Sequence, residues 1–147
     1  MIDLLKNPFC SIENVQAGTP ANAIVRFFYG WKIRNLDLML ENCQITWKEK
    51  PRPKEKLELF FGDLFIVGMK ITNIKMINPC MYDIVMQVGF KKRNQYKVII
   101  TIVTGQVICE SKPRELDING KWGLNPLTIL KAFGIYKRIF VNPENII

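Results

Sequence analysis

The fold is decided by the stretch 82-YDIVMQVGFKKRNQYKVIITIVTGQVIC-109, which holds two apolar runs around a basic turn. From Tyr82 to Phe90 every second residue is apolar, the pattern of a strand with one buried face. The second run, residues 98–103, is apolar at nearly every position and therefore on both faces. Because the turn Lys92-Arg93-Asn94 is short, it predicts an antiparallel hairpin between the two strands.

Strand-like and helix-like sequence divides the chain into two halves. β-Branched and aromatic residues are concentrated in the second half, in residues 66–77, 82–90, 96–109 and 116–124. Asn78-Pro79 is a turn between the first two of these runs. Apolar stripes at helical spacing precede them, near residues 20–33, 36–43 and 57–64. Helices first and strands afterwards predict an α+β fold rather than an alternating α/β fold.

Helix-start signals and prolines set the boundaries. Thr19-Pro20 is typical of a capped helix start, and Asn35 can cap the second helix. Residues 44–48 look β-like and are followed by a link that prolines interrupt. Pro126 opens a last segment, residues 127–140, that we expect to be helical.

Length and composition favour one globular unit. The chain has 147 residues, of which 48% are hydrophobic and 23% charged, enough for one well-developed core. We expect a single domain over residues 1–147, with its core in about 19–130 and the placement of 131–147 left open. No apolar run approaches the ~20 residues that span a bilayer. The first ten residues lack the pattern of a secretory leader, so a cytoplasmic protein is expected.

Several chemistries are excluded by residue type. The chain contains no histidine, which removes Ser-His and Cys-His nucleophile pairs and histidine metal ligands. The four cysteines lie far apart without a C-x-x-C pair, so we expect reduced, mostly buried thiols; they are Cys10, Cys43, Cys80 and Cys109. No phosphate-loop, dinucleotide, hydrolase-elbow or calcium motif occurs. We therefore expect no metal and no cofactor.

The two-faced run at residues 98–103 raises the question of what covers its second face. A partner subunit stacked on the open face of the sheet would do so, which favours a homodimer. The alternative is that the C-terminal segment folds back over that face. The sequence leaves both open.

The order of elements resembles the nuclear-transport-factor-two-like (NTF2-like), or cystatin-like cone, superfamily. The resemblance rests on this order over about residues 19–130, on Phe27-Phe28-x-x-Trp31, on Ile45-Thr46-Trp47 as a strand before the third helix, and on Trp122 in a late strand. It implies N-terminal helices packed in the concave face of a strongly bent, mostly antiparallel sheet that leaves a conical pocket. In many relatives the sheet also forms a dimer.

The resemblance does not imply an activity, because members include isomerases, dehydratases, cyclases, transport proteins and scaffold or assembly components. Enzymes of the superfamily commonly place an aspartate, a tyrosine and often a histidine in the cone. The histidine is missing here, which argues against a dehydratase in particular.

An isomerase-like site needs a carboxylate base and a hydroxyl donor. The set that offers both is Tyr29 with Asp37, Asp83 or Glu110 as the base. Each of these residues can also have a purely structural role. The ring of Tyr29 can pack at the border of the core while its hydroxyl is exposed to solvent. Asp37 and Glu41 share a helix face and are favoured by the helix dipole. A surface ion pair with Lys112 or Arg114 would account for Glu110.

Large side chains could also line a pocket for a flat apolar ligand. The candidate walls are Trp31, Trp47 and Trp122, with Met39, Met69 and Met86 as adaptable neighbours. Aromatic residues at this spacing are more often core. Trp122 is the strongest candidate, so the predicted pocket residues are Tyr29, Trp47, Trp122, Asp83 and Glu110.

The net charge of +8 is concentrated in two places. Residues 48–56 carry +3, and residues 91–97 carry +4. The predicted basic patches are Lys50, Arg52 and Lys54 in the link, and Lys91, Lys92 and Arg93 at the hairpin tip. Such projections can bind phosphates without sequence preference, or an acidic protein partner. They can also simply keep a hydrophobic sheet soluble.

Together these patterns favour a non-enzymatic binding or assembly module. We expect it to dimerise through its sheet and to bind a small apolar ligand or an acidic partner. The alternatives are a small isomerase-like or lyase-like enzyme that uses Tyr29 and a carboxylate, and a nonspecific nucleic-acid binder that uses the basic hairpin.

Overall fold

Helices form the first half of the fold and strands the second. The computed structural model describes residues 16–133. The helices are α1 (Pro20–Lys32), α2 (Leu36–Glu41), α3 (Ile45–Lys48) and α4 (Pro53–Phe61). The strands are β1 (Leu64–Asn78), β2 (Met81–Lys92), β3 (Ile99–Lys112), β4 (Glu115–Leu116) and β5 (Lys121–Asn125). The short helix α5 (Leu127–Leu130) and the 3-10 turn η2 (Lys131–Phe133) follow.

The predicted helix starts are confirmed. The hydroxyl of Thr19 accepts the backbone N–H of Asn22 at 3.2 Å, and Pro20 occupies the first helical position. The side chain of Asn35 accepts the backbone N–H of Leu38 at 3.0 Å. Each cap satisfies a donor that the first helical turn leaves without an intrahelical partner.

Residues 44–48 are not β-like, and that prediction is wrong. Residues 45–48 form helix α3 instead. The carboxylate of Glu110, on strand β3, accepts the backbone N–H of Thr46 in the first turn of this helix at 3.1 Å. A tertiary contact thus overrides the strand preference of Ile45 and Thr46, which rests on local propensity alone.

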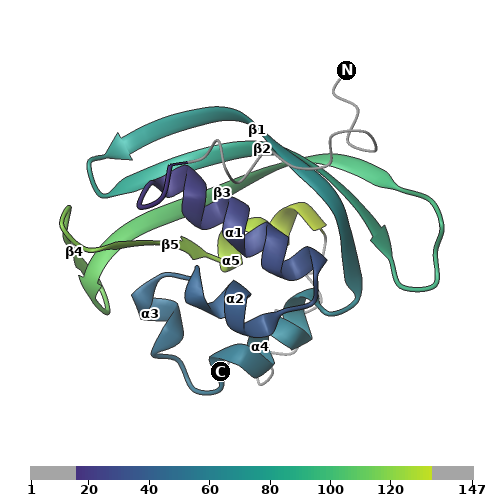
Figure 1. Ribbon diagram of the computed structural model, residues 1–147, viewed down its shortest axis with the longest axis horizontal. Helices are drawn as coiled ribbons and strands as arrows, with labels where there is room; N and C mark the ends of the chain where they lie inside the picture. Colours follow the sequence, from purple (N-terminus) through teal and green to yellow (C-terminus); the bar gives the residue numbers. More distant parts are fainter. Residues whose placement is uncertain (1–15, 134–147) are drawn as a thin grey trace.

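The sheet is antiparallel and open. Its strand order is β1-β2-β3-β4, and β5 pairs with β3. The β1–β2 ladder is interrupted by register shifts at Ile66/Gly68, Ile71/Asn73 and Met76/Asn78. Bulges of this kind bend a strand and increase its twist. Figure 1 shows the long strands curving around α1 and α2, which lie on the concave side.

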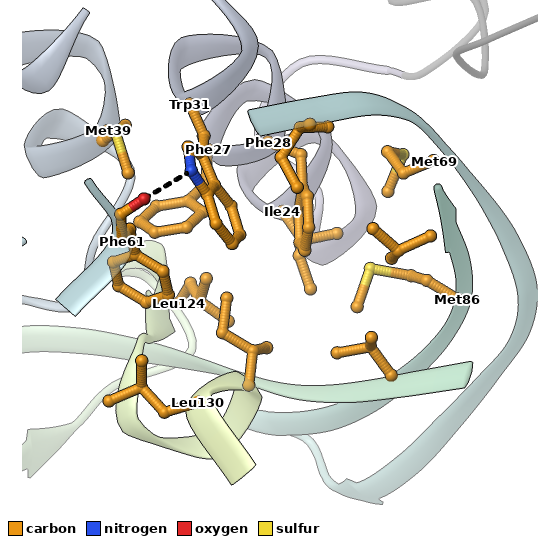
Figure 2. Packing of buried hydrophobic residues seen from close by; sticks show 14 of the residues in the cluster. Ile24, Phe27, Phe28, Trp31, Met39, Phe61, Met69, Met86, Leu124 and Leu130 are labelled. Atoms are coloured by element: carbon orange, nitrogen blue, oxygen red, sulfur yellow. Dashed lines mark hydrogen bonds between the residues drawn. The ribbon is translucent and has the colours of Figure 1, made fainter. Parts of the chain in front are cut away.

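The concave side is filled by side chains. Phe27, Phe28 and Trp31 on α1 are buried against Phe61 on α4 and against the inner face of β2 and β3. The indole N–H of Trp31 donates to the carbonyl oxygen of Phe61 at 3.1 Å (Figure 2). It also donates to the carbonyl oxygen of Leu64, at 3.1 Å. Burial of one such side chain stabilises the fold by ~1.5–3 kcal/mol. This core therefore fixes the helices inside the bend.

The α+β class and the helices in the concave face of a bent antiparallel sheet are confirmed. The predicted last helix is present as α5 and η2 as far as Phe133, and its remainder lies outside the described residues. The expected single domain over residues 1–147 stays a prediction. So does the absence of a leader, because residues 1–15 lie outside the described part.

Candidate functional site

Tyr29 and Asp83 lie on different sides of the sheet. Tyr29 is on α1, on the concave side, and its side chain is partly exposed. On β2 the neighbour Ile84 points inward and is buried. Because side chains alternate along a strand, Asp83 points to the convex side, opposite Gln106 on β3 and Lys75 on β1. The structure therefore does not bring these two predicted pocket residues together.

Glu110 holds a structural contact rather than the expected surface ion pair. Its side chain is only 2% exposed. Its carboxylate accepts the backbone N–H groups of Thr46 and Arg114, each at 3.1 Å, and the hydroxyl of Thr46. The side chain of Arg114 pairs with Glu49, and that of Lys112 with Glu115. The ion-pair expectation was wrong because the β3–β4 turn directs backbone donors, not cationic groups, at this carboxylate.

The other carboxylate proposed as a base is also engaged. Asp37 on α2 forms an ion pair with Lys54 on α4 at 2.7 Å. The carboxylates of Asp37 and Glu110 thus each have a partner of their own, and a Tyr–carboxylate site that uses either of them stays a prediction.

The two candidate tryptophans have different surroundings. Trp47 on α3 is buried and packs edge-on against Phe60, with ring centres 5.9 Å apart. Its indole N–H has no hydrogen-bond partner within the described part of the chain. Trp122 on β5 is half-buried and packs edge-on against Tyr82 on β2, with ring centres 5.4 Å apart. Trp122 thus contacts the wall of the hollow described next.

An apolar hollow lies at the mouth of the bend. It has a volume of about 430 Å³ and lies between the start of α1 and the inner face of β1 and β2. Its walls are Gln16, Thr19, Pro20, Ala21, Ile71, Ile74 and Tyr82. Sequence reasoning missed these residues. The available signal was the alternation of apolar residues in β1 beyond the length that α1 can cover.

The two predicted basic patches lie apart. The link after α3, which carries Lys50 and Arg52, is in the lower left of Figure 1 and leads into α4, which carries Lys54; the β2–β3 turn is at the right edge. Lys54 is neutralised by Asp37, and Arg93 pairs with Asp63 at 3.4 Å. Lys91 and Arg93, together with Tyr96, line an open hollow of about 500 Å³. No single basic surface joins the two stretches.

A further group of lysines is assembled only by the fold. Lys48 on α3 and Lys121 on β5 are close enough for their charges to interact. Partial burial, and then the charge of Lys121, lower the pKa of Lys48. Burial and the charge of Lys50 likewise lower the pKa of Lys56 on α4. Like charges this close resist being ionised together, so an anion placed between them would relieve the repulsion.

This approach of α3 to β5 depends on close backbone contact. The N–H of Leu124 donates to the carbonyl of Asn42 at 2.8 Å, and the N–H of Gln44 donates to the carbonyl of Leu124 at 2.9 Å. A Cβ on Gly123 would lie 2.5 Å from the carbonyl of Cys43. Glycine is therefore required for β5 to reach the α2–α3 link.

The convex face of β3 exposes large apolar side chains. On this strand Val103 points to the inner face and is buried, whereas Ile100 and Ile102 point outward and are 45% and 59% exposed. Ile102 lies opposite Gln87 on β2, and Gln87 lies opposite Lys70 on β1. The sequence prediction that residues 98–103 are apolar on both faces is confirmed, and nothing within residues 16–133 covers the outer one.

The described part of the chain has neither a cluster of metal ligands nor a membrane-spanning helix. Residues 16–133 contain no group of three or more cysteine and acidic side chains that could hold a metal ion. None of the helices between residues 16 and 133 is long and apolar enough to cross a membrane.

Comparison with known proteins shows the fold and nothing further. No protein-family model matches the chain, and no curated protein matches its sequence. A SEC-C motif-containing protein from Psychrobacter arcticus has a TM-score of 0.56 and 8% identity over 75% of this chain. This chain spans 60% of that protein's length. An NTF-2-like protein of unknown function from Shewanella oneidensis MR-1 has a TM-score of 0.46 and 14% identity, covering 72% of this chain and 94% of its own.

Proposed function

We propose that this protein is a non-enzymatic binding or assembly module that forms a homodimer through the convex face of its sheet. The single observation that carries the proposal is the exposure of Ile100 and Ile102 on the outer face of β3, in the stretch of that strand that pairs with β2 but not with β4 or β5. Scattered apolar residues on a surface are ordinary, but branched apolar pairs on an open sheet face favour association. The proposed partner is a second copy, which would bury the same residues from both sides.

The size of the face supports this partner. Strands β1, β2 and β3 have 15, 12 and 14 residues. At ~3.3 Å per residue and ~4.8 Å of width per strand, they present roughly 650 Å² in projection. The accessible surface of a pleated face is larger than its projection. It is thus comparable with the ~800 Å² that each partner buries in a standard interface.

A matched pair of variants tests the dimer. Ile102→Lys would place two new charges in the interface, and we expect it to weaken self-association at least tenfold. Leu59→Lys changes an apolar residue that is similarly exposed, at 55%, but lies on helix α4. It should leave self-association unchanged. Equal sedimentation of Ile102→Lys and the unmodified dimer would reject the convex face as the interface.

A small apolar ligand would occupy the hollow at the mouth of the bend. Its walls are mostly apolar, and its volume of about 430 Å³ falls within the range of small-molecule sites. Two wall residues carry a hydroxyl, Thr19 and Tyr82. That of Thr19 is bonded to Gln16 and Asn22 at the start of α1, so Tyr82 is the one to orient a ligand, and Trp122 packs edge-on against its ring. The test is the binding of a fluorescent apolar probe to the protein and to two variants. Loss of probe binding in Ile74→Glu, with binding kept in Ile118→Glu, would support this site.

An acidic protein partner would bind the lysine surface of α3 and β5. Four lysines come together here: Lys48 on α3, Lys121 on β5, Lys56 on α4, and Lys50 in the link between α3 and α4. Lys48 and Lys121 repel each other, and so do Lys50 and Lys56. A carboxylate group between Lys48 and Lys121 would relieve that repulsion. Poly-L-glutamate serves as the probe: its binding should weaken in Lys121→Gln and remain in Lys75→Gln, which removes a lysine from the distant end of β1.

Nonspecific nucleic-acid binding is the second candidate, and one observation favours it. Tyr96 in the β2–β3 turn is 97% exposed beside Lys91 and Arg93. An exposed aromatic ring next to cations can stack a base while the cations bind phosphates. Charge reversal of Lys91, Lys92 and Arg93 should abolish salt-sensitive retention on single-stranded DNA. Unchanged retention would remove the hairpin from consideration.

A further inference from the structure

Two cysteines that are distant in the sequence meet at one end of the sheet. The β2–β3 ladder runs through the pair Met81 and Ile108. One step further along the same register, Cys80 stands opposite Cys109, and the N–H of Cys109 donates to the carbonyl of Cys80 at 2.8 Å. Directly opposed residues of an antiparallel pair point to the same side of the sheet. Both thiols therefore lie on one side.

The spacing suits a disulfide. The N–H of Cys80 donates to the side chain of Asn78 at 2.8 Å, so the two cysteines share one backbone hydrogen bond rather than two. Opposed residues of antiparallel strands have Cα atoms ~4.5–5.5 Å apart, inside the ~4.4–6.8 Å range over which disulfides form. The two sulfur atoms are close enough for the charge of one to raise the pKa of the other, in addition to the larger effect of burial on Cys109. Both are free thiols in the structure.

We propose that Cys80 and Cys109 are a site of reversible oxidation, at which a peroxide converts the thiol pair into a cross-strand disulfide. Cys80 is the residue that the oxidant reaches, because it is partly exposed whereas Cys109 is fully buried. The bond ties the β1–β2 turn to β3 and closes a long loop of chain.

The chemistry balances with the peroxide as the oxidant. The Cys80 thiolate attacks one peroxide oxygen, which gives a sulfenic acid at Cys80 and releases the other oxygen as water once it is protonated. The sulfur of Cys109 then attacks the sulfur of Cys80, and the hydroxyl group leaves with the Cys109 proton as a second water. The thiol pair loses two protons and two electrons in total, and the peroxide is reduced to two molecules of water.

Such a bond would also affect the hollow. Tyr82, which lies two residues after Cys80, forms one wall of it, and Trp122 stands opposite Cys109 on β5. Locking Cys80 onto Cys109 holds this wall in place. This consequence rests on the proposed ligand hollow, whereas the oxidation site itself does not.

The test uses the full chain under native conditions. Hydrogen peroxide is added, free thiols are alkylated, and peptides are mapped by mass spectrometry. The expected result is one cross-link between Cys80 and Cys109 that dithiothreitol removes, with a midpoint of thermal unfolding raised by about 5–10 °C. In Cys80→Ser both the cross-link and the shift should be absent. In Cys43→Ser they should remain, because Cys43 lies elsewhere, beside Met39.

Two results would overturn the proposal. One is alkylation of both Cys80 and Cys109 in folded protein after peroxide treatment. The other is a disulfide that joins either cysteine to Cys10, to Cys43 or to another molecule in preference to this pair. If Cys43→Ser fails to fold, the peptide map of the unmodified chain decides alone.

Discussion

The carboxylate of Glu110 accepts the backbone N–H of Thr46 at 3.1 Å, across a separation of 64 residues. The same carboxylate accepts the hydroxyl of Thr46 and the backbone N–H of Arg114. One buried side chain thereby connects the first turn of α3 with the turn between β3 and β4. This connection holds α3, which carries Lys48, against the end of β3.

Glu110→Gln should lower the free energy of unfolding by about 1–3 kcal/mol, because an amide turns one acceptor oxygen into a donor facing other donors. Urea unfolding measures the change. Glu115→Gln is the matched control: its ion pair with Lys112 is exposed and 3.9 Å long. That variant should change stability by less than about 0.5 kcal/mol. Equal effects at both positions would contradict the role given to Glu110.

Trp31 and Trp47 offer a second matched pair, since both are buried. The N–H of Trp31 makes two hydrogen bonds, whereas that of Trp47 makes none within residues 16–133. Replacement by Phe removes similar apolar area at each position. Trp31→Phe should therefore cost about 1–3 kcal/mol more than Trp47→Phe in urea unfolding. The reverse order would contradict the hydrogen bonding described for α1.

Lys48 gives a prediction in alkaline solution. Its pKa in the folded protein is below the ordinary value of 10.5, so the unfolded chain binds this proton more tightly. Its contribution to the free energy of unfolding therefore rises with pH, from the folded pKa of Lys48 up to the unfolded value. Lys48→Met should make this rise smaller in thermal or urea unfolding measured across that range.

Lys54→Met is the control for this titration. Asp37 raises the pKa of Lys54. The small stabilisation from Lys54 is thus present below the unfolded pKa and is lost as the pH rises through the folded one. This substitution should leave the alkaline rise in place. A rise of unchanged size in Lys48→Met would show that neither burial nor the charge of Lys121 lowers the pKa of Lys48 in the folded protein.

The helices and strands could be predicted because their periodicity is local. Thr19 and Asn35 signal helix starts within four residues, and the alternation from Tyr82 to Phe90 marks a buried face without knowledge of its neighbours. The helix at residues 45–48 could not be predicted, because the acceptor that organises its first turn is Glu110, far along the chain. The local propensity of Ile45 and Thr46 favours a strand instead.

The candidate sites were harder to predict for the same reason. Runs of charge such as residues 91–97 are visible in the sequence, but the pairing of Lys48 with Lys121 and of Cys80 with Cys109 depends on strand register. Side-chain direction was also decisive. Asp83 lies on the face away from the helices, and a sequence pattern cannot show that Tyr29 lies on the other side of the same sheet.

The most direct test of the central proposal is the mass of the unmodified full chain in solution. Sedimentation equilibrium at micromolar concentration should give twice the mass of the chain, and dilution should shift the mass toward one copy. The same dimer should be lost in Ile102→Lys and kept in Leu59→Lys. A single-copy mass at every concentration up to the highest micromolar range would contradict dimerisation through the convex face of the sheet.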